Sequence, residues 1–117
     1  MTQNITVEDF RKHKKEKTKF ACLTAYDASL SRLMSEAGVE LILVGDSLGM
    51  VLYDHENTLS VTLQQMINHS QAVVKSTSKA CIVTDMPFGT YEESVDVAFK
   101  NAAKVMKETH CSAIKIE

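Results

Sequence analysis

The order of its apolar segments is the feature that most constrains the fold of this chain. Four short apolar runs, each of strand length, alternate with three longer segments in which apolar residues recur at helical spacing. The runs cover residues 20–24, 41–44, 80–84 and 113–117, and the helical segments cover residues 28–37, 63–74 and 95–106. Such alternation predicts a parallel sheet whose strands are joined by right-handed crossover helices.

Capping residues indicate where several helices begin and end. Thr6 with Asp9 three residues later predicts a short helix before the first strand, and Thr62 is suited to begin the segment from residue 63. Gly38 is suited to end the segment that precedes it. The basic residues of 11–19 are expected on a solvated helix face, with phosphate contact as the alternative. A long polar loop is expected after the second strand.

Two closures of the sheet remain open at this point. The uninterrupted Leu-Ile-Leu-Val run of residues 41–44 is typical of a parallel strand covered on both faces. Both an open doubly wound sheet and a (β/α)8 barrel have such strands. A complete barrel needs about 250 residues, and the 117 residues here supply four strands. We therefore expect a single partial domain over residues 1–117.

The composition excludes several classes of protein. The chain is 44% hydrophobic and 24% charged with a formal net charge of −2, so it has no general field to attract nucleic acid or an anionic membrane. No apolar run approaches the roughly 18 residues of a membrane span, and the N-terminus lacks the layout of a signal peptide. A cytoplasmic protein is expected. The cysteines have no metal-binding spacing and are expected to act as small hydrophobic residues: Cys22, Cys81 and Cys111.

An acidic residue stands at the carboxyl end of each predicted strand, where parallel α/β proteins bind their ligands. These residues are Asp27, Asp46, Asp85 and Glu117. Each one alone can be explained as a helix cap or a turn residue. Together they would repel one another unless a cation or a proton joins them. Oxygen ligands without a cysteine or histidine pattern favour a hard cation such as Mg²⁺.

The last predicted strand adds a basic residue to this set. Lys115 and Glu117 are two residues apart and project to one face, whereas Ile114 and Ile116 project to the other. This pattern suits a barrel strand with helices outside and a polar site inside, where Lys115 would offset the charge of an anionic substrate. An edge strand with a solvated face is the alternative.

The segment Gly-Asp-Ser-Leu-Gly at residues 45–49 has a second interpretation, because it also matches a signature of esterases with a nucleophilic serine. That chemistry needs a histidine oriented by an acid, and no histidine here has Asp three residues before it. We therefore expect Ser47 to donate a hydrogen bond rather than to attack. Gly45 and Gly49 are expected to let the backbone approach the ligand.

Several motifs together resemble the N-terminal half of the ketopantoate hydroxymethyltransferase family. They are TAYD (24–27), VGDSLGM (44–50), HENTLSVT (55–62), TDMPF (84–88), FKNAA (99–103) and KIE (115–117). The resemblance implies an α/β fold, the N-terminal half of a (β/α)8 TIM barrel like those of phosphoenolpyruvate mutase and isocitrate lyase. It also implies a Mg²⁺-dependent enzyme of pantothenate synthesis that forms homo-oligomers, commonly decamers. Its reaction transfers a hydroxymethyl group from 5,10-methylenetetrahydrofolate to 3-methyl-2-oxobutanoate, giving ketopantoate by Mg²⁺-assisted enolate formation.

The resemblance also implies roles for particular residues. Asp46, Asp85 and Glu117 would surround the metal, and Asp46, Ser47, Asp85 and Lys115 would border the oxo acid. The family's general base is a glutamate in the second half of the barrel, so no catalytic residue is assigned here. We expect this chain alone to be inactive. The alternative is a catalytically silent remnant, or a metal-binding module, of the same ancestry.

Overall fold

The computed structural model describes residues 4–117, and residues 1–3 of the expected domain lie outside the described part. The elements are α1 (Val7–Glu16), β1 (Cys22–Thr24), α2 (Ala28–Glu36), β2 (Leu41–Val44), α3 (Leu48–Val51), α4 (Leu63–Ser76), β3 (Cys81–Asp85), α5 (Val95–Thr109) and β4 (Ala113–Lys115). The strands form one parallel sheet in the order β1-β2-β3-β4. The predicted order of helices and strands is confirmed, except that α3 was not predicted.

Local capping explains why the helices begin and end where they do. In α4 the Thr62 hydroxyl accepts the Gln65 N–H at 3.1 Å, and the Gln65 side chain accepts the Thr62 N–H at 2.9 Å. In α1 the Thr6 N–H donates to Asp9 Oδ2 at 2.7 Å. Gly38 follows α2 with a φ of +93°, a left-handed conformation that favours glycine. These predicted helix limits are confirmed.

The short helix α3 replaces the first part of the predicted polar loop, so that prediction is wrong over residues 48–51. Leu48 is fully buried and anchors this segment in the core. The Ser47 carbonyl accepts hydrogen bonds from the N–H groups of Met50 and Val51, at 2.9 and 3.0 Å. A helix of one turn is too short to show a periodic pattern, which is why the sequence does not reveal it.

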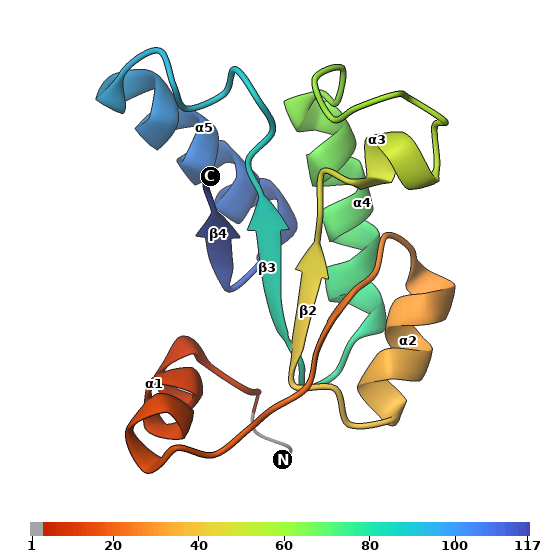
Figure 1. Ribbon diagram of the computed structural model, residues 1–117, viewed down its shortest axis with the longest axis vertical. Helices are drawn as coiled ribbons and strands as arrows, with labels where there is room; N and C mark the ends of the chain where they lie inside the picture. The colour runs from red at the N-terminus through yellow and green to blue at the C-terminus, as the bar shows by residue number, and fades with distance from the viewer. Residues whose placement is uncertain (1–3) are drawn as a thin grey trace.

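Three helices cover one face of the sheet, which we call the covered face. From left to right in Figure 1 the helices of this layer are α5, α4 and α2, and α4 packs against both of the others. Residues of β2, β3, α4 and α5 meet beneath them in one core: Ile42, Val44, Ile82, Met66, Ile67, Val73 and Val105. A doubly wound sheet would carry helices on both faces. One helical layer is the arrangement of a barrel.

The opposite face, which we call the open face, is only partly covered. Leu41, Leu43 and Val83 alternate with the core residues and are partly exposed. Helix α1 lies at the amino-terminal end of the strands (Figure 1), where the Phe10 and Phe20 ring centroids are 4.5 Å apart. The predicted cover on both faces of β2 is therefore not met within residues 4–117.

Exposure at a sheet edge explains one further difference from the sequence-based expectations. Cys81 and Cys111 are buried as expected, but Cys22 is exposed because β1 is an edge strand.

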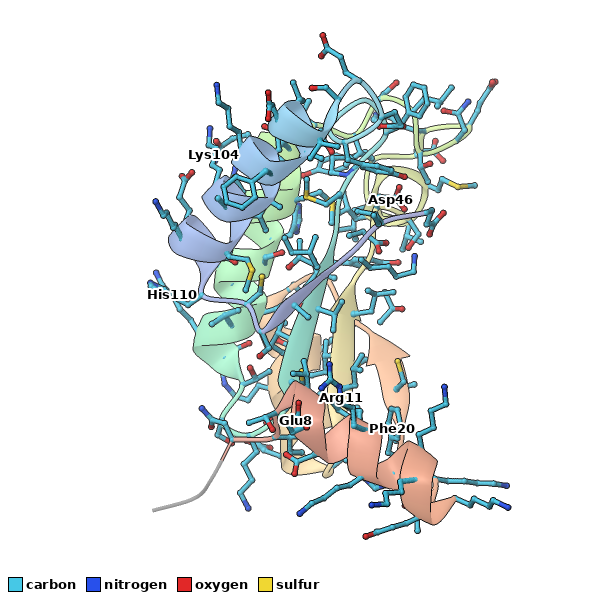
Figure 2. The ribbon with its side chains drawn as sticks, turned by 90° about the vertical axis from the view of Figure 1, so that its left-hand side faces the viewer. Glu8, Arg11, Phe20, Asp46, Lys104 and His110 are labelled. Carbon is cyan, nitrogen blue, oxygen red and sulfur yellow. The ribbon has the colours of Figure 1, made fainter. Side chains whose placement is uncertain are left out.

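Helix α1 buries no residue, and its basic side chains are solvated as expected. Glu8 and Arg11 form an ion pair of 2.9 Å on its surface (Figure 2). No helix within residues 4–117 is both long and apolar enough to cross a bilayer.

Candidate active site

The predicted site residues meet at the carboxyl ends of three neighbouring strands. Asp46 and Ser47 follow β2, Asp85 ends β3, and Lys115 ends β4 with Glu117 two residues later. The arrowheads in Figure 1 point to this end of the sheet, and Figure 2 shows Asp46 there. We call these five residues the rim cluster.

Asp85 is the centre of the rim cluster. Only 5% of this residue is exposed. Its Oδ2 accepts the main-chain N–H of Asp46 at 3.1 Å, and its Oδ1 accepts a hydrogen bond from Lys115 Nζ at 3.2 Å. A buried carboxylate is costly unless it is paired and hydrogen-bonded, and both conditions are met here. Asp85 thereby connects the ends of β2 and β4.

The two glycines beside Asp46 and Ser47 serve different contacts. A Cβ at Gly45 would lie 3.1 Å from Ser47 Oγ and 3.5 Å from Asp85 Oδ2, so glycine lets β2 pass close to the rim cluster. A Cβ at Gly49 would lie 2.5 Å from a methyl carbon of Val61. Gly45 therefore allows the rim cluster to pack closely against the end of β2, whereas Gly49 allows close packing against the loop before α4. Close approach of either glycine to a ligand stays a prediction.

Negative charge dominates the electrostatics of the rim cluster. Burial raises the pKa of Asp46, and the neighbouring Asp85 and Glu117 carboxylates raise it further, whereas Lys115 and a contact with Thr58 oppose this. The pKa of Lys115 is raised chiefly by its hydrogen bond to Glu117; burial acts against this, and the interaction with Asp85 raises it further. Three carboxylates thus share one ammonium group, which leaves an excess of negative charge for a cation.

The donor set fits a hard cation, although it is not arranged as a three-carboxylate cage. Within residues 4–117 no group of three His, Cys, Asp or Glu side chains is placed to hold a metal. Lys115 contacts both Asp85 and Glu117, so the ammonium occupies oxygens that a cation would use. Mg²⁺ commonly takes one or two carboxylates and completes its shell with water and substrate oxygens. The rim cluster fits that mode of binding.

Ser47 takes part in a hydrogen-bond network that the sequence did not predict. Ser47 Oγ lies 2.7 Å from Tyr26 Oη. The Tyr26 carbonyl accepts a hydrogen bond from His69 Nδ1 at 2.7 Å, and His69 Nε2 lies 2.9 Å from Tyr53 Oη. The only signal for Tyr26 was its place in TAYD at the end of the first strand. The serine therefore has a tyrosine partner rather than the histidine that an esterase needs.

Two other residues near the strand ends have structural roles, one of them expected and the other not predicted. Asp27 is a helix cap, because its Oδ1 accepts the Leu30 N–H at 2.8 Å. Of the two explanations for this acid, the cap is confirmed. Tyr91 was not predicted: its hydroxyl donates to the Glu117 carbonyl at 2.8 Å and accepts the Glu117 N–H at 3.1 Å. Tyr91 therefore holds the main chain of Glu117.

Comparison with known proteins identifies one family over nearly the whole chain. The family model for ketopantoate hydroxymethyltransferase matches residues 4–117. The 3-methyl-2-oxobutanoate hydroxymethyltransferase of Paramagnetospirillum magneticum is 52% identical over 98% of this chain and 41% of its own length. The enzyme of that name from Brucella canis is 57% identical over 81% of this chain and 34% of its own length. The chain thus spans well under half the length of these curated relatives.

Solved structures share the fold at low sequence identity. Phosphonopyruvate hydrolase, in a complex with oxalate and Mg²⁺, superposes with a TM-score of 0.72 at 15% identity, over 92% of this chain and 36% of that protein. A 2,3-dimethylmalate lyase, a member of the PEP mutase/isocitrate lyase superfamily, has a TM-score of 0.68 at 14% identity, over 93% of this chain and 39% of its own. The predicted fold class is confirmed.

Proposed function

Because the chain belongs to the ketopantoate hydroxymethyltransferase family, we propose that it carries the metal and oxo-acid part of a transferase site. The reaction is transfer of a hydroxymethyl group from 5,10-methylenetetrahydrofolate to 3-methyl-2-oxobutanoate, which gives 2-dehydropantoate. The observation that carries this proposal is the buried Asp85 carboxylate, which joins Asp46 and Lys115 at the carboxyl end of the sheet.

The carboxylate of the oxo acid would bind to Ser47 and Lys115. The Lys115 ammonium is the cation of the rim cluster, and its raised pKa keeps it charged at neutral pH. The Ser47 hydroxyl can donate a hydrogen bond to an oxygen that only accepts. Together they give a charge and a direction for binding one end of a small 2-oxo acid.

Asp46, Asp85 and Glu117 would supply oxygen ligands for Mg²⁺, directly or through water. The bound metal would polarise the keto oxygen and acidify the neighbouring C–H group. The complex of phosphonopyruvate hydrolase with oxalate and Mg²⁺ supports this proposal, because that enzyme shares the fold. Removing the proton from carbon needs a general base, and the proposal assigns none to the rim cluster.

Assembly and location are proposed on the family resemblance. We propose homo-oligomers, a cytoplasmic location, and small-molecule partners only: the oxo acid and the folate. A net charge of −2 supports the absence of nucleic-acid and anionic-membrane partners.

Calorimetric titration of the purified chain with 3-methyl-2-oxobutanoate, with and without Mg²⁺, tests the proposal. We expect binding that requires Mg²⁺ and that weakens at least about tenfold in Asp85→Asn, because this change removes the charge at the centre of the site. Asp27→Asn is the matched control, since it makes the same chemical change at a helix cap and should keep the affinity. Equal binding without Mg²⁺ or in Asp85→Asn would contradict the proposal, and Mg²⁺ binding without oxo-acid binding would favour a metal-binding module.

A further inference from the structure

We propose that Tyr26 is a positioning residue for the oxo acid, because its hydroxyl orients the Ser47 side chain toward the acid's carboxylate. This inference rests on the proposed function and adds to it a residue that does not itself touch the metal. The evidence is a hydrogen-bond network that begins at the rim cluster and ends in α4.

The Ser47 hydroxyl has no structural task of its own in the helix that it precedes. Ser47 stands at the N-cap position of α3, where a serine side chain commonly accepts a main-chain N–H, but its hydroxyl makes no such bond. Its side-chain partner is Tyr26 Oη at 2.7 Å. Tyr26 therefore decides which way this hydroxyl points.

The donor and acceptor inventory gives the network a direction. A serine hydroxyl has one hydrogen and two lone pairs, and a carboxylate can only accept. If Tyr26 donates its hydrogen to Ser47 Oγ, the Ser47 hydrogen is left free to donate to a substrate oxygen. In the opposite order, Ser47 would donate its hydrogen to Tyr26, and only its lone pairs would face the carboxylate. Only the first order supports binding of an oxo acid.

Tyr26 is itself held firmly, on both sides of its peptide. On one side, the Ala25 N–H donates to the Leu43 carbonyl at 3.1 Å and so continues the pairing of β1 with β2. On the other side, the Tyr26 carbonyl accepts from His69 Nδ1 at 2.7 Å. Since a carbonyl cannot donate, Nδ1 carries the hydrogen in this contact. Tyr26 is thus fixed between the sheet and α4.

A double-mutant cycle with Tyr26→Phe and Ser47→Ala tests the inference, with the affinity for 3-methyl-2-oxobutanoate in the presence of Mg²⁺ as the readout. We expect Tyr26→Phe to weaken binding about three- to tenfold, the value of one well-placed hydrogen bond. In the Ser47→Ala background the same change should have no further effect, because Tyr26 acts through Ser47. Tyr53→Phe is the matched control: it removes a tyrosine hydroxyl, leaves both Tyr26 contacts in place, and should bind as wild type.

A purely structural role would give different results. It would lower the affinity for Mg²⁺ alone, which Tyr26→Phe should leave unchanged, and its effect would add to that of Ser47→Ala. Either result would overturn the inference. If the wild-type chain binds the oxo acid and Tyr26→Phe binds it equally well, only this inference fails. If the wild-type chain binds no oxo acid, the proposed function fails and this inference falls with it.

Discussion

The two faces of the sheet use alternate residues of the same strands for different purposes. On the covered face Ile42 and Val44 are fully buried beneath the helices. On the open face Leu41 and Leu43 are partly exposed, and the carboxyl end of that face carries Asp85 and its partner Lys115. The strand period of two thereby separates the residues that hold the fold together from those that can meet a ligand. Stability and chemistry are expected to respond to different substitutions.

The largest expected effect contrasts neighbouring residues of β2. Ile42→Ala should lower the free energy of unfolding by about 2–5 kcal/mol, because it leaves a cavity in the core. Leu43→Ala on the open face should cost less than half as much, since water already reaches that side chain. Urea unfolding of the two variants measures both values. Equal losses would break the comparison, because they would show that the open face is covered in solution.

Thr84 and Asp85, consecutive residues of β3, contrast an effect on stability with an effect on binding. Thr84 Oγ1 and Ser70 Oγ are 2.8 Å apart in the buried interface between β3 and α4. Thr84→Val should cost about 1–3 kcal/mol of stability, because the Ser70 hydroxyl loses its partner. Its affinity for the oxo acid should match wild type, in contrast to that of Asp85→Asn. Urea unfolding measures the stability, and calorimetric titration of the same preparation measures the affinity. A changed oxo-acid affinity in Thr84→Val would count against this separation of roles.

Two cysteines, Cys22 and Cys81, allow an exposed and a buried position of the open face to be compared. Cys22 and Cys81 align in the same row of that face, but Cys22 lies on an edge strand and is exposed. Burial raises the pKa of the Cys81 thiol, which makes its reactive thiolate rarer. We expect iodoacetamide at pH 8 to modify Cys22 at once and Cys81 only after unfolding. Mass spectrometry of the modified peptides reports both rates, and rapid modification of Cys81 would show that this part of the face opens.

The smallest expected effect lies in α1, which belongs to neither face. The Thr6 main-chain N–H lowers the pKa of Asp9 below its ordinary value of 3.8. A carboxyl with a lowered folded-state pKa stabilises the fold above the unfolded value and loses that contribution as pH falls through the folded value. Asp9→Asn should therefore lower the stability slightly at pH 6 and converge with wild type in acid. Urea midpoints across pH 3–7 test this, and a constant difference at all pH values would refute it.

Sequence patterns predicted the features that depend on neighbouring residues. The limits of β2 and the cap of α4 follow from short apolar and capping signals, and the rim cluster follows from the rule that strand ends bind ligands. The contact of Tyr26 with Ser47 joins residues 21 positions apart, and that with His69 joins residues 43 apart. No local pattern records such pairs, because they exist only once the strands and α4 are in place.

The double contact of Lys115 has a consequence for how two ligands would influence each other. This ammonium is the internal counter-ion of Asp85 and Glu117. A cation that took those oxygens would release Lys115 toward an anion, and an anion that drew Lys115 away would release the oxygens for a cation. By thermodynamic linkage each ligand then strengthens the other by the same factor. The two ion pairs of Lys115 would thus make the binding of metal and acid cooperative, and each ligand would bind weakly without the other.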